Sequence, residues 1–176
     1  WNPSLDVYTV SINDTNTLQN LTSNLVVSGN CKFPTVYDTG GAANQVTDTD
    51  NDEMDDQWEI NHFGTITDKD GSGDHDGDGL SDLAEYICGT APTNAADRLT
   101  LTITKSSNSA HLKYETVSAP TGLDRLYDLE SRTSLTAGRW DPVNGETDIA
   151  GDDSEHVVTN ALPQNAEFFR LKVRLQ

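Results

Sequence analysis

Carboxylate side chains gather in one stretch of the chain, in numbers that call for a chemical explanation. Residues 48–85 carry 14 of the 29 Asp and Glu residues but a single basic residue, Lys69. The remainder holds 15 acidic against 10 basic residues, so the net charge of −18 is largely a property of this stretch. Carboxylates crowded within a few ångströms repel one another unless a cation lies among them. Calcium is the best candidate, because it takes about six to eight oxygen ligands and tolerates a flexible chain as their donor.

The spacing of these acids matches the twelve-residue calcium loop of an EF-hand twice. That loop supplies ligands from positions 1, 3, 5, 7, 9 and 12, with a backbone carbonyl at 7 and a glycine at 6 for the sharp turn. The predicted ligands of the second loop are Asp74, Asp76, Asp78, Leu80, Asp82 and Glu85. The first loop begins 26 residues earlier, and its predicted ligands are Asp48, Asp50, Asp52, Met54, Asp56 and Glu59. Gly79 occupies position 6 of the second loop, whereas Glu53 stands there in the first, a departure that bears on its geometry or affinity.

A third calcium site is suggested by the residues that lead into the second loop. Asp68, Asp70 and Ser72 resemble the first half of another loop, but Gly79 stands where its twelfth ligand would be. Two interpretations are open: these residues share an ion with the start of the second loop, or they form a polar turn. For the whole acidic stretch the alternative is a solvated linker. A linker, however, has no need of a glycine and a glutamate at the template positions.

A short helix is expected after each loop. The second loop is followed by an apolar face with helical spacing, which Ser81 or Asp82 can cap at its start and Gly89 at its end. The residues of that face are Leu80, Leu83, Ala84 and Ile87. The other helix is expected over residues 55–62, with Trp58, Ile60 and Phe63 as apolar anchors and Gly64 as the stop. Calcium would draw the carboxylates together and so contribute folding free energy.

Residues 1–47 are expected to form a short β segment without a core of its own. Residues 5–12 alternate as a strand does, and Leu25–Val27 suggests another. One interpretation is a hairpin packed onto the rest of the chain. The other is a pair of strands that complete a sheet in a neighbouring subunit or an upstream domain.

The composition changes after residue 92, and residues 93–176 read as an antiparallel β-sandwich. Strands are predicted over residues 98–104, 110–115, 125–131, 138–143, 155–159 and 167–175, separated by turn-forming residues. Tyr127, Trp140 and Phe169 are the expected core aromatics, and stacking on carbohydrate is the alternative for Trp140. The fold class is therefore mainly β, with a small calcium-binding loop–helix segment at residues 48–92.

Two cysteines and the lack of a long apolar run bear on where the protein works. Cys31 and Cys88 can form one disulfide between the N-terminal segment and the second helix, or remain two buried thiols. The sequence has no apolar run long enough to span a bilayer. It opens with Trp1 and without a signal peptide, as expected of a processed protein or an excised fragment. A calcium-dependent sequence fits a millimolar-calcium exterior better than a cytosol, so the predicted location is extracellular or on the cell surface.

The order of the motifs resembles a C-terminal arrangement of secreted and surface proteins of environmental bacteria. The motifs are DTDNDEMDDQWE, HFG, DHDGDGLSDLAEY, GTAPTN, YDLESRTSLTAGRW and FFRLKV. The calcium part is similar to thrombospondin type 3 repeats and, in its loop–helix form, to dockerins. The resemblance covers residues 48–176. It implies calcium at the loop positions named above, and a structural or tethering role beside a fibronectin-III-like or immunoglobulin-like sandwich.

No enzymatic motif accompanies the acidic stretch. His62, His75, His111 and His156 are scattered along the sequence, and no GxSxG, HExxH or phosphate-binding glycine loop occurs. Calcium ligation explains the paired acids with fewer assumptions than a glycosidase dyad does. A charge of −18 repels nucleic acid. We therefore expect a non-enzymatic protein that does not bind nucleic acid.

Two functions from different classes remain open. The first is a calcium-rigidified structural subunit of a surface layer, adhesin or filament, whose partners would be copies of itself or cell-surface proteins. The second is a binding module that tethers a larger secreted enzyme to a partner or a polysaccharide. Contacts between subunits through residues 1–12 would favour the first. A groove lined with exposed aromatic side chains would favour the second.

Overall fold

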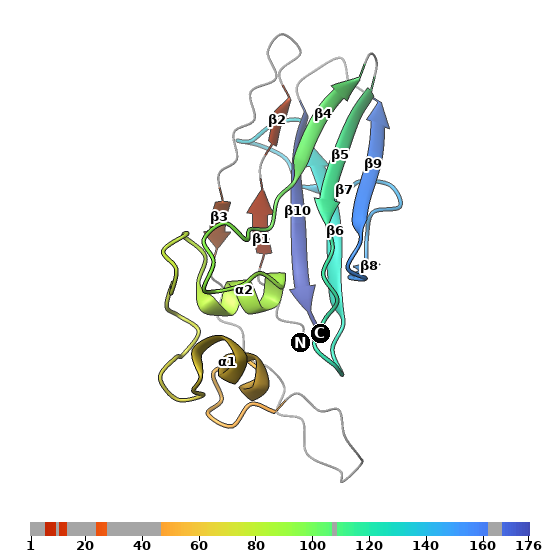
Figure 1. Cartoon of the computed structure of the whole chain (residues 1–176). Coiled ribbons are helices and arrows are strands. Elements are labelled where there is room, and N and C mark those ends of the chain that lie inside the picture. The colour runs from red at the N-terminus through yellow and green to blue at the C-terminus, as the bar shows by residue number, and fades with distance from the viewer. Residues whose placement is uncertain (1–5, 10, 14–23, 28–46, 107–108, 162–166) are drawn as a thin grey trace.

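A computed structural model describes residues 6–9, 11–13, 24–27, 47–106, 109–161 and 167–176, and it is mainly β (Figure 1). Its two helices are α1 (Asp56–Phe63) and α2 (Asp82–Cys88). Its strands are β1 (Asp6–Thr9), β2 (Ser11–Asn13), β3 (Asn24–Val27), β4 (Thr102–Ser106), β5 (Ser109–Glu115), β6 (Arg125–Arg132), β7 (Asp141–Pro142), β8 (Ile149–Ala150), β9 (Glu155–Ala161) and β10 (Glu167–Leu175). The expectation of a mainly β chain with a few short helices is confirmed.

The C-terminal strands form two antiparallel sheets. One has the order β4-β5-β9, and the other has the order β2-β10-β6-β7, with β8 also paired to β6. In the first sheet Leu112 lies opposite both Ile103 and Val158. In the second, Leu171 lies opposite Leu129. These registers place apolar side chains of neighbouring strands on the same face of each sheet.

Side chains from both sheets meet in one apolar core. Alternate residues of β10 are buried, as the period of a strand requires. These residues are Phe169, Leu171, Val173 and Leu175. Tyr114 of β5 stacks against Tyr127 of β6, with 6.1 Å between the ring centroids. Residues of both sheets therefore belong to one buried apolar cluster.

The helical segment joins this core from one end. In Figure 1 α1 lies below the sheets as drawn, and α2 lies beside the lower end of β10, which it contacts. Ala84, Tyr86 and Ile87 of α2 belong to the buried core, and Trp58 of α1 packs edge-to-face on Tyr86 at 5.1 Å. The buried guanidinium of Arg125 donates hydrogen bonds to the carbonyl oxygens of Tyr86 (2.9 Å) and Ile87 (2.8 Å). Arg125, at the start of β6, thus ties the end of α2 to the second sheet.

Two of the expected apolar anchors are placed differently from the prediction. Ile60 is 48 % exposed, because it lies two residues beyond Trp58 and so faces the opposite side of α1 from the core. Trp140 is only partly buried and is not in the core. It precedes the short strand β7, and the guanidinium groups of Arg132 and Arg170 lie 4.5 Å and 4.6 Å from its ring centroid. Tyr127 and Phe169 are buried as expected.

Most predicted elements are present, and several boundaries differ. Both helices are confirmed, with Ser81 as the N-cap of α2. The strand predicted over residues 98–104 begins only at Thr102, and the one predicted over 138–143 is reduced to β7. The two-residue strand β8 was not predicted, because two residues are too few to show an alternating pattern.

The described strands of the N-terminal segment pair within the chain. β1 pairs with β3, and β2 pairs with β10. Whether this segment is only a hairpin packed onto the rest of the chain or also links subunits stays a prediction. Leu5 and Val10 of the predicted N-terminal strand lie outside the described residues. Cys31 does too, so its disulfide with Cys88 stays a prediction; Cys88 itself is buried. No helix within the described ranges is long and apolar enough to cross a membrane.

Candidate metal centre

The two predicted loops share one backbone conformation. At position 4, Asn51 has φ 63° and Gly77 has φ 78°. At position 6, Glu53 has φ 79° and Gly79 has φ 99°. A side chain in this left-handed region costs about 1–2 kcal/mol. Glu53 therefore adopts the left-handed conformation that Gly79 has in the second loop, and the backbone turn is kept at a cost in strain.

The first and fifth positions bind the backbone of each loop in the same way. Asp48 accepts hydrogen bonds from the N–H groups at positions 5 and 6 of its loop, both at 3.2 Å. Asp74 accepts those at positions 4, 5 and 6 of the second loop, at 2.7, 3.1 and 3.0 Å. At position 5, Asp52 and Asp78 each accept the N–H two residues on, at 3.0 Å and 2.8 Å. These bonds turn each loop inward, so that its carboxylates surround a common centre.

Each loop runs directly into its helix through an N-cap at position 8. The side chain of Asp55 accepts the N–H of Trp58 at 3.0 Å, and that of Ser81 accepts the N–H of Ala84 at 3.2 Å. Positions 9 and 12 consequently fall three residues apart in the first helical turn, on one face. The helices end at Gly64 and Gly89, with the left-handed conformation of a C-cap.

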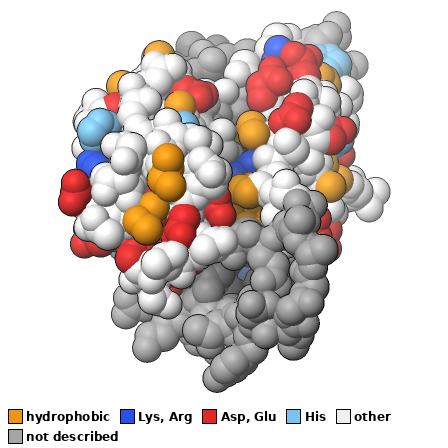
Figure 2. Space-filling view, turned by 60° about the horizontal axis from the view of Figure 1, so that its bottom comes forward, with side chains coloured by type: hydrophobic (Ala, Val, Ile, Leu, Met, Phe, Trp, Pro, Cys, Tyr) orange, Lys and Arg blue, Asp and Glu red, His pale blue; other side chains and the backbone are white. Residues whose placement is uncertain are grey.

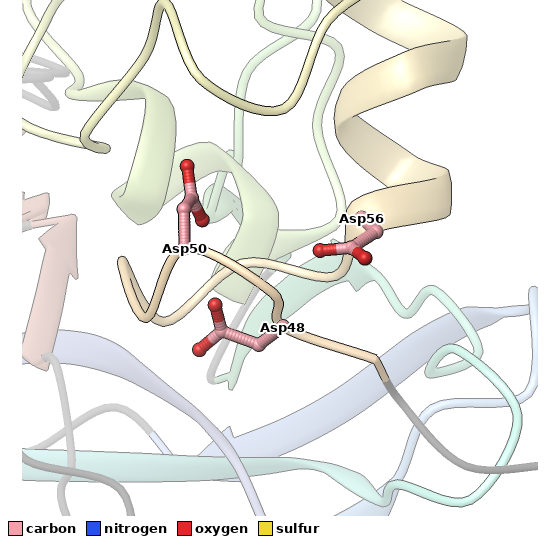
Figure 3. A group of neighbouring side chains, drawn as sticks. All are labelled: Asp48, Asp50 and Asp56. Atoms are coloured by element: carbon pink, nitrogen blue, oxygen red, sulfur yellow. The ribbon is translucent and has the colours of Figure 1, made fainter.

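In the first loop five carboxylates come together in two overlapping groups. Asp48, Asp50 and Asp56 each offer an oxygen within 4.8 Å of the others, with Asp48 and Asp50 on the loop and Asp56 at the start of α1 (Figure 3). Asp50, Asp52 and Glu59 form the second group by the same measure. Oxygens on opposite sides of a calcium ion are about 4.8 Å apart, since each Ca–O distance is about 2.4 Å. The spacing of each group therefore suits one calcium ion.

The second loop brings three of its aspartates together and turns one predicted ligand elsewhere. Asp74, Asp76 and Asp78 offer oxygens within 4.8 Å of one another. Asp82, at position 9, instead accepts the N–H of His75 through Oδ1 at 3.0 Å, and its Oδ2 lies 3.8 Å from Lys69 Nζ. The structure thus places Asp82 outside this group, in contrast to Asp56 at the same position of the first loop.

The glutamates at position 12 are fully buried and short of hydrogen-bond donors. Glu59 and Glu85 are both 0 % exposed. Neither carboxylate oxygen of Glu59 has a hydrogen-bond donor. Glu85 Oε1 accepts the hydroxyl of Thr90 at 3.3 Å, whereas its Oε2 has no donor. A buried carboxylate without a partner is costly, and native structures generally satisfy such groups.

Burial and the nearby aspartates raise the pKa values of these two glutamates. Burial, followed by the charges of Asp52 and Asp50, raises the pKa of Glu59 to about 8. Burial, followed by the charges of Asp76 and Asp78, raises the pKa of Glu85 to about 8. Each glutamate therefore faces the aspartates of its own loop. Burial likewise raises the pKa of Asp52 to about 6.

Position 7 anchors each loop to the core. Met54 and Leu80, whose backbone carbonyls are the predicted ligands, have side chains that are only 1 % exposed. Both belong to the same buried cluster as the sheet residues. Figure 2 shows this end of the molecule, where acidic side chains are spread over the surface and basic ones are few. Each loop thus has an apolar residue in the core and carboxylates around its turn.

The residues of the suggested third site form a turn in this structure. Asp70 Oδ1 accepts both the N–H of Ser72, at 3.0 Å, and its hydroxyl, at 2.6 Å. Asp68 and Asp70 are exposed, and neither is in an acidic group of metal-binding spacing within the described residues. The carbonyl of Gly71 accepts the N–H of Leu83 at 3.0 Å, which holds the turn against α2. The geometry therefore favours the polar turn, and a third ion stays a prediction.

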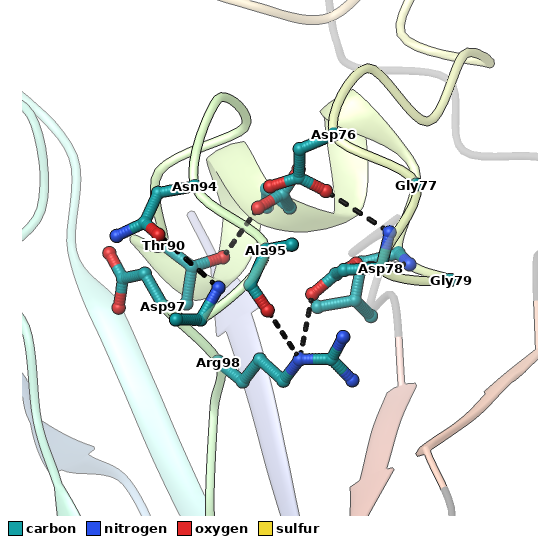
Figure 4. A network of polar contacts seen from close by, with 12 residues as sticks. Asp76, Gly77, Asp78, Gly79, Thr90, Asn94, Ala95, Asp97 and Arg98 are labelled. Carbon is teal, nitrogen blue, oxygen red and sulfur yellow. Dashed lines mark hydrogen bonds and ion pairs between the residues drawn. The ribbon is translucent and has the colours of Figure 1, made fainter.

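Two contacts of the second loop could not be found from the spacing of acids. Thr90 bonds Glu85, and the guanidinium of Arg98 lies 3.3 Å from Asp78, measured from Nε to Oδ2 (Figure 4). Neither residue belongs to the twelve-residue template. Only the path of the chain after α2 brings them to the loop.

Comparisons with models of protein families, with curated proteins and with solved structures found no match. The resemblance to thrombospondin type 3 repeats and dockerins therefore stays a prediction. The function has to be argued from the site itself.

Proposed function

We propose that residues 48–85 bind two calcium ions, one in each loop, and that the protein is an extracellular calcium-binding structural module. The observation that carries this proposal is the pair of buried glutamates. Glu59 has no hydrogen-bond donor at either oxygen, and Glu85 has none at Oε2. Both face aspartates that would repel them unless a cation lay between.

The donor set favours calcium over other metals. The acidic groups of the described residues contain carboxylates alone, without His or Cys. Zinc and copper prefer nitrogen or sulfur ligands, whereas calcium takes oxygens and accepts irregular geometry. Magnesium demands a tighter octahedron and retains several waters. A loop that offers up to five carboxylates, one of them a glutamate at the bidentate position, therefore suits calcium best.

The ions would act mainly on the folding of the helical segment. The two helices have only 8 and 7 residues, too few to be stable alone. Each is preceded by a loop whose charges repel one another, and whose position 7 lies in the core. Calcium would remove the repulsion and hold loop, helix and core together. The module we propose is thus a calcium-rigidified segment set against a β-sandwich made by the two sheets.

The proposal extends to a structural role at the cell surface, in a layer, adhesin or filament. Calcium at millimolar concentration outside the cell can fill sites of modest affinity, which supports the extracellular location. The N-terminal strands β1 and β2 are paired within the chain.

Calorimetric titration of the metal-free protein with calcium tests the proposal. We expect two binding events, a rise in thermal stability, and much weaker binding of magnesium. Glu59→Gln and Glu85→Gln should each remove one event, whereas Glu115→Gln, at an exposed position of β5, should remove neither. Absence of binding at millimolar calcium would refute the proposal. Light scattering on the same samples would show whether calcium promotes assembly.

A further inference from the structure

The second loop already contains a cation of its own. Arg98 Nε lies 3.3 Å from Oδ2 of Asp78, whose side chain is 0 % exposed. The Arg98 side chain is 39 % exposed, so the guanidinium sits at the mouth of the loop and partly in solvent. Figure 4 shows this side chain reaching Asp78 from the segment that follows α2. Asp78 is also the residue at position 5 of the calcium template.

The ion pair between Arg98 and Asp78 can break with a small loss of free energy. Arg98 Nε donates its hydrogen bond to the carbonyl oxygen of Ala95, at 2.8 Å. Asp78 Oδ2 has no hydrogen-bond donor, while Oδ1 accepts the N–H of Leu80. If Asp78 turned to a calcium ion, Arg98 would keep its bond to Ala95 and lose only the attraction of opposite charges.

The segment between α2 and β4 is attached to the second loop at both of its ends. Thr90 bonds Glu85 at one end, and Arg98 pairs with Asp78 at the other. Between them the backbone N–H of Ala91 donates to the carboxylate of Asp97 at 3.1 Å. Both attachments therefore use carboxylates that we assign to the same calcium ion. Leu99 and Leu101, directly after this segment, are buried in the core.

Within the described part of the chain, no basic side chain is seen against the five carboxylates assigned to the first loop. These are Asp48, Asp50, Asp52, Asp56 and Glu59. Basic side chains approach the second loop at two places, Arg98 at Asp78 and Lys69 at Asp82. The two loops share a backbone conformation but differ in how their charge is balanced without calcium.

We propose that Arg98 is a built-in counter-cation of the second loop, which calcium displaces from Asp78, so that this loop binds calcium more weakly than the first and reports its occupancy to residues 90–98. The inference rests on the proposed function, because it concerns the regulation of the same site. A guanidinium and a calcium ion cannot both lie against one buried carboxylate without strong repulsion. The ion pair therefore competes with calcium at the second loop.

The test compares calcium binding by the wild-type protein and by Arg98→Gln. Backbone amide resonances of Gly77 and Gly79 report the second loop, and those of Asn51 and Glu53 report the first. An exposed ion pair is worth a few-fold in an equilibrium constant, so removing the competitor should tighten binding at the second loop roughly three- to tenfold. Affinity at the first loop should not change.

Two further variants separate charge from other effects of the substitution. Arg98→Lys keeps the positive charge, and it should bind calcium at the second loop about as wild type does. Arg139→Gln is the matched control, because Arg139 also pairs through Nε with an aspartate but lies on the exposed approach to β7. It should leave both loops unchanged.

The outcomes distinguish this inference from the proposed function. Calcium binding that is unchanged or weaker at the second loop of Arg98→Gln, with wild-type binding intact, would overturn the counter-cation alone. The counter-cation would also be overturned if Arg98→Lys bound calcium at the second loop as tightly as Arg98→Gln does, because charge would then not be the cause. Failure of the wild-type protein to bind calcium at all would overturn both. In the wild type, a calcium-dependent shift of the Arg98 Nε–H resonance would support displacement.

Discussion

Replacing Glu59 by glutamine should have opposite effects with and without calcium. Burial, followed by the charges of Asp52 and Asp50, raises the pKa of Glu59 from its ordinary 4.5 to about 8. The folded metal-free chain therefore holds a proton that the unfolded chain releases, and stability falls as the pH rises from about 4.5 to about 8. At pH 7 the unfolded carboxyl lies roughly 2.5 pH units above its pKa, which corresponds to about 3 kcal/mol.

The metal-free Glu59→Gln variant should consequently be more stable than wild type by about 3 kcal/mol at pH 7. Glutamine has nearly the shape of the protonated acid and takes up no proton on folding. At pH 4.5 most of the gain should be gone, because the folded wild-type chain is protonated at Glu59 and the unfolded chain is already half protonated there. The window of the effect is thus set by the shift of this one carboxyl.

Calcium should reverse the sign of the effect. The amide offers no charge and one oxygen where the template places a bidentate carboxylate. A site filled at about 1,000 times its Kd contributes about 4.1 kcal/mol to stability, more than the metal-free gain of about 3 kcal/mol, and the variant would lose this at the first loop. Under saturating calcium at pH 7 it should therefore gain far less from the ion than wild type does.

Urea unfolding followed by circular dichroism measures these differences at pH 7 and at pH 4.5, with and without calcium. Glu115→Gln is the control, because Glu115 is exposed on β5 and should change stability little under any condition. If metal-free Glu59→Gln were less stable than wild type at pH 7, the carboxylate would have a favourable partner without calcium. The same shift at both pH values would show that packing and not charge is responsible.

Two substitutions test the joint between the helical segment and the sheets, and the core between the sheets. Arg125→Met leaves four carbonyl acceptors without their buried donor, and it should cost about 3–5 kcal/mol in urea unfolding. Arg139→Met, in an exposed ion pair, should lower the free energy of unfolding by less than about 1 kcal/mol. Equal losses in the two variants would show that Arg125 does not hold α2 to the second sheet. Leu112→Ala, at a position 0 % exposed between β4 and β9, should cost about 2–5 kcal/mol. Val157→Ala, at a position 54 % exposed, is its control, and a comparable loss there would contradict the assignment of the core.

Features that depend on neighbours in sequence were predictable. The glycines that end both helices, the turn residues of the second loop and the alternation of residues 167–175 each depend on a few adjacent residues. The helix after each loop was predicted from apolar residues and a stop glycine, whereas Asp55, expected inside the first helix, is its N-cap. In contrast, the turn at Glu53 departed from the template in sequence and still has the template's conformation. The surrounding hydrogen bonds to Asp48 hold that conformation against its local cost.

Features that depend on distant segments were missed. Trp140 is an aromatic residue in a strand-like stretch, yet the arginines that flank it come from β6 and β10, and it lies outside the core. Ile60 was expected to be an apolar anchor, but which face of α1 is buried depends on how the helix packs, and the sequence did not show this. Arg98 reaches Asp78 because the segment after α2 folds back to the loop, and no spacing in the sequence predicts this contact.

The sequence by itself determined where carboxylates are concentrated, which glycines end the helices and that the chain is mainly β. These properties follow from charge density, local hydrogen bonding and the two-residue period of strands. Only the tertiary structure decided that Glu59 and Glu85 are buried without sufficient partners, that Asp82 bonds the backbone of His75 and lies outside the group of Asp74, Asp76 and Asp78, and that Arg98 lies beside Asp78. Burial and long-range charge depend on which surfaces meet, and the packing of the helical segment on the sheets settles that.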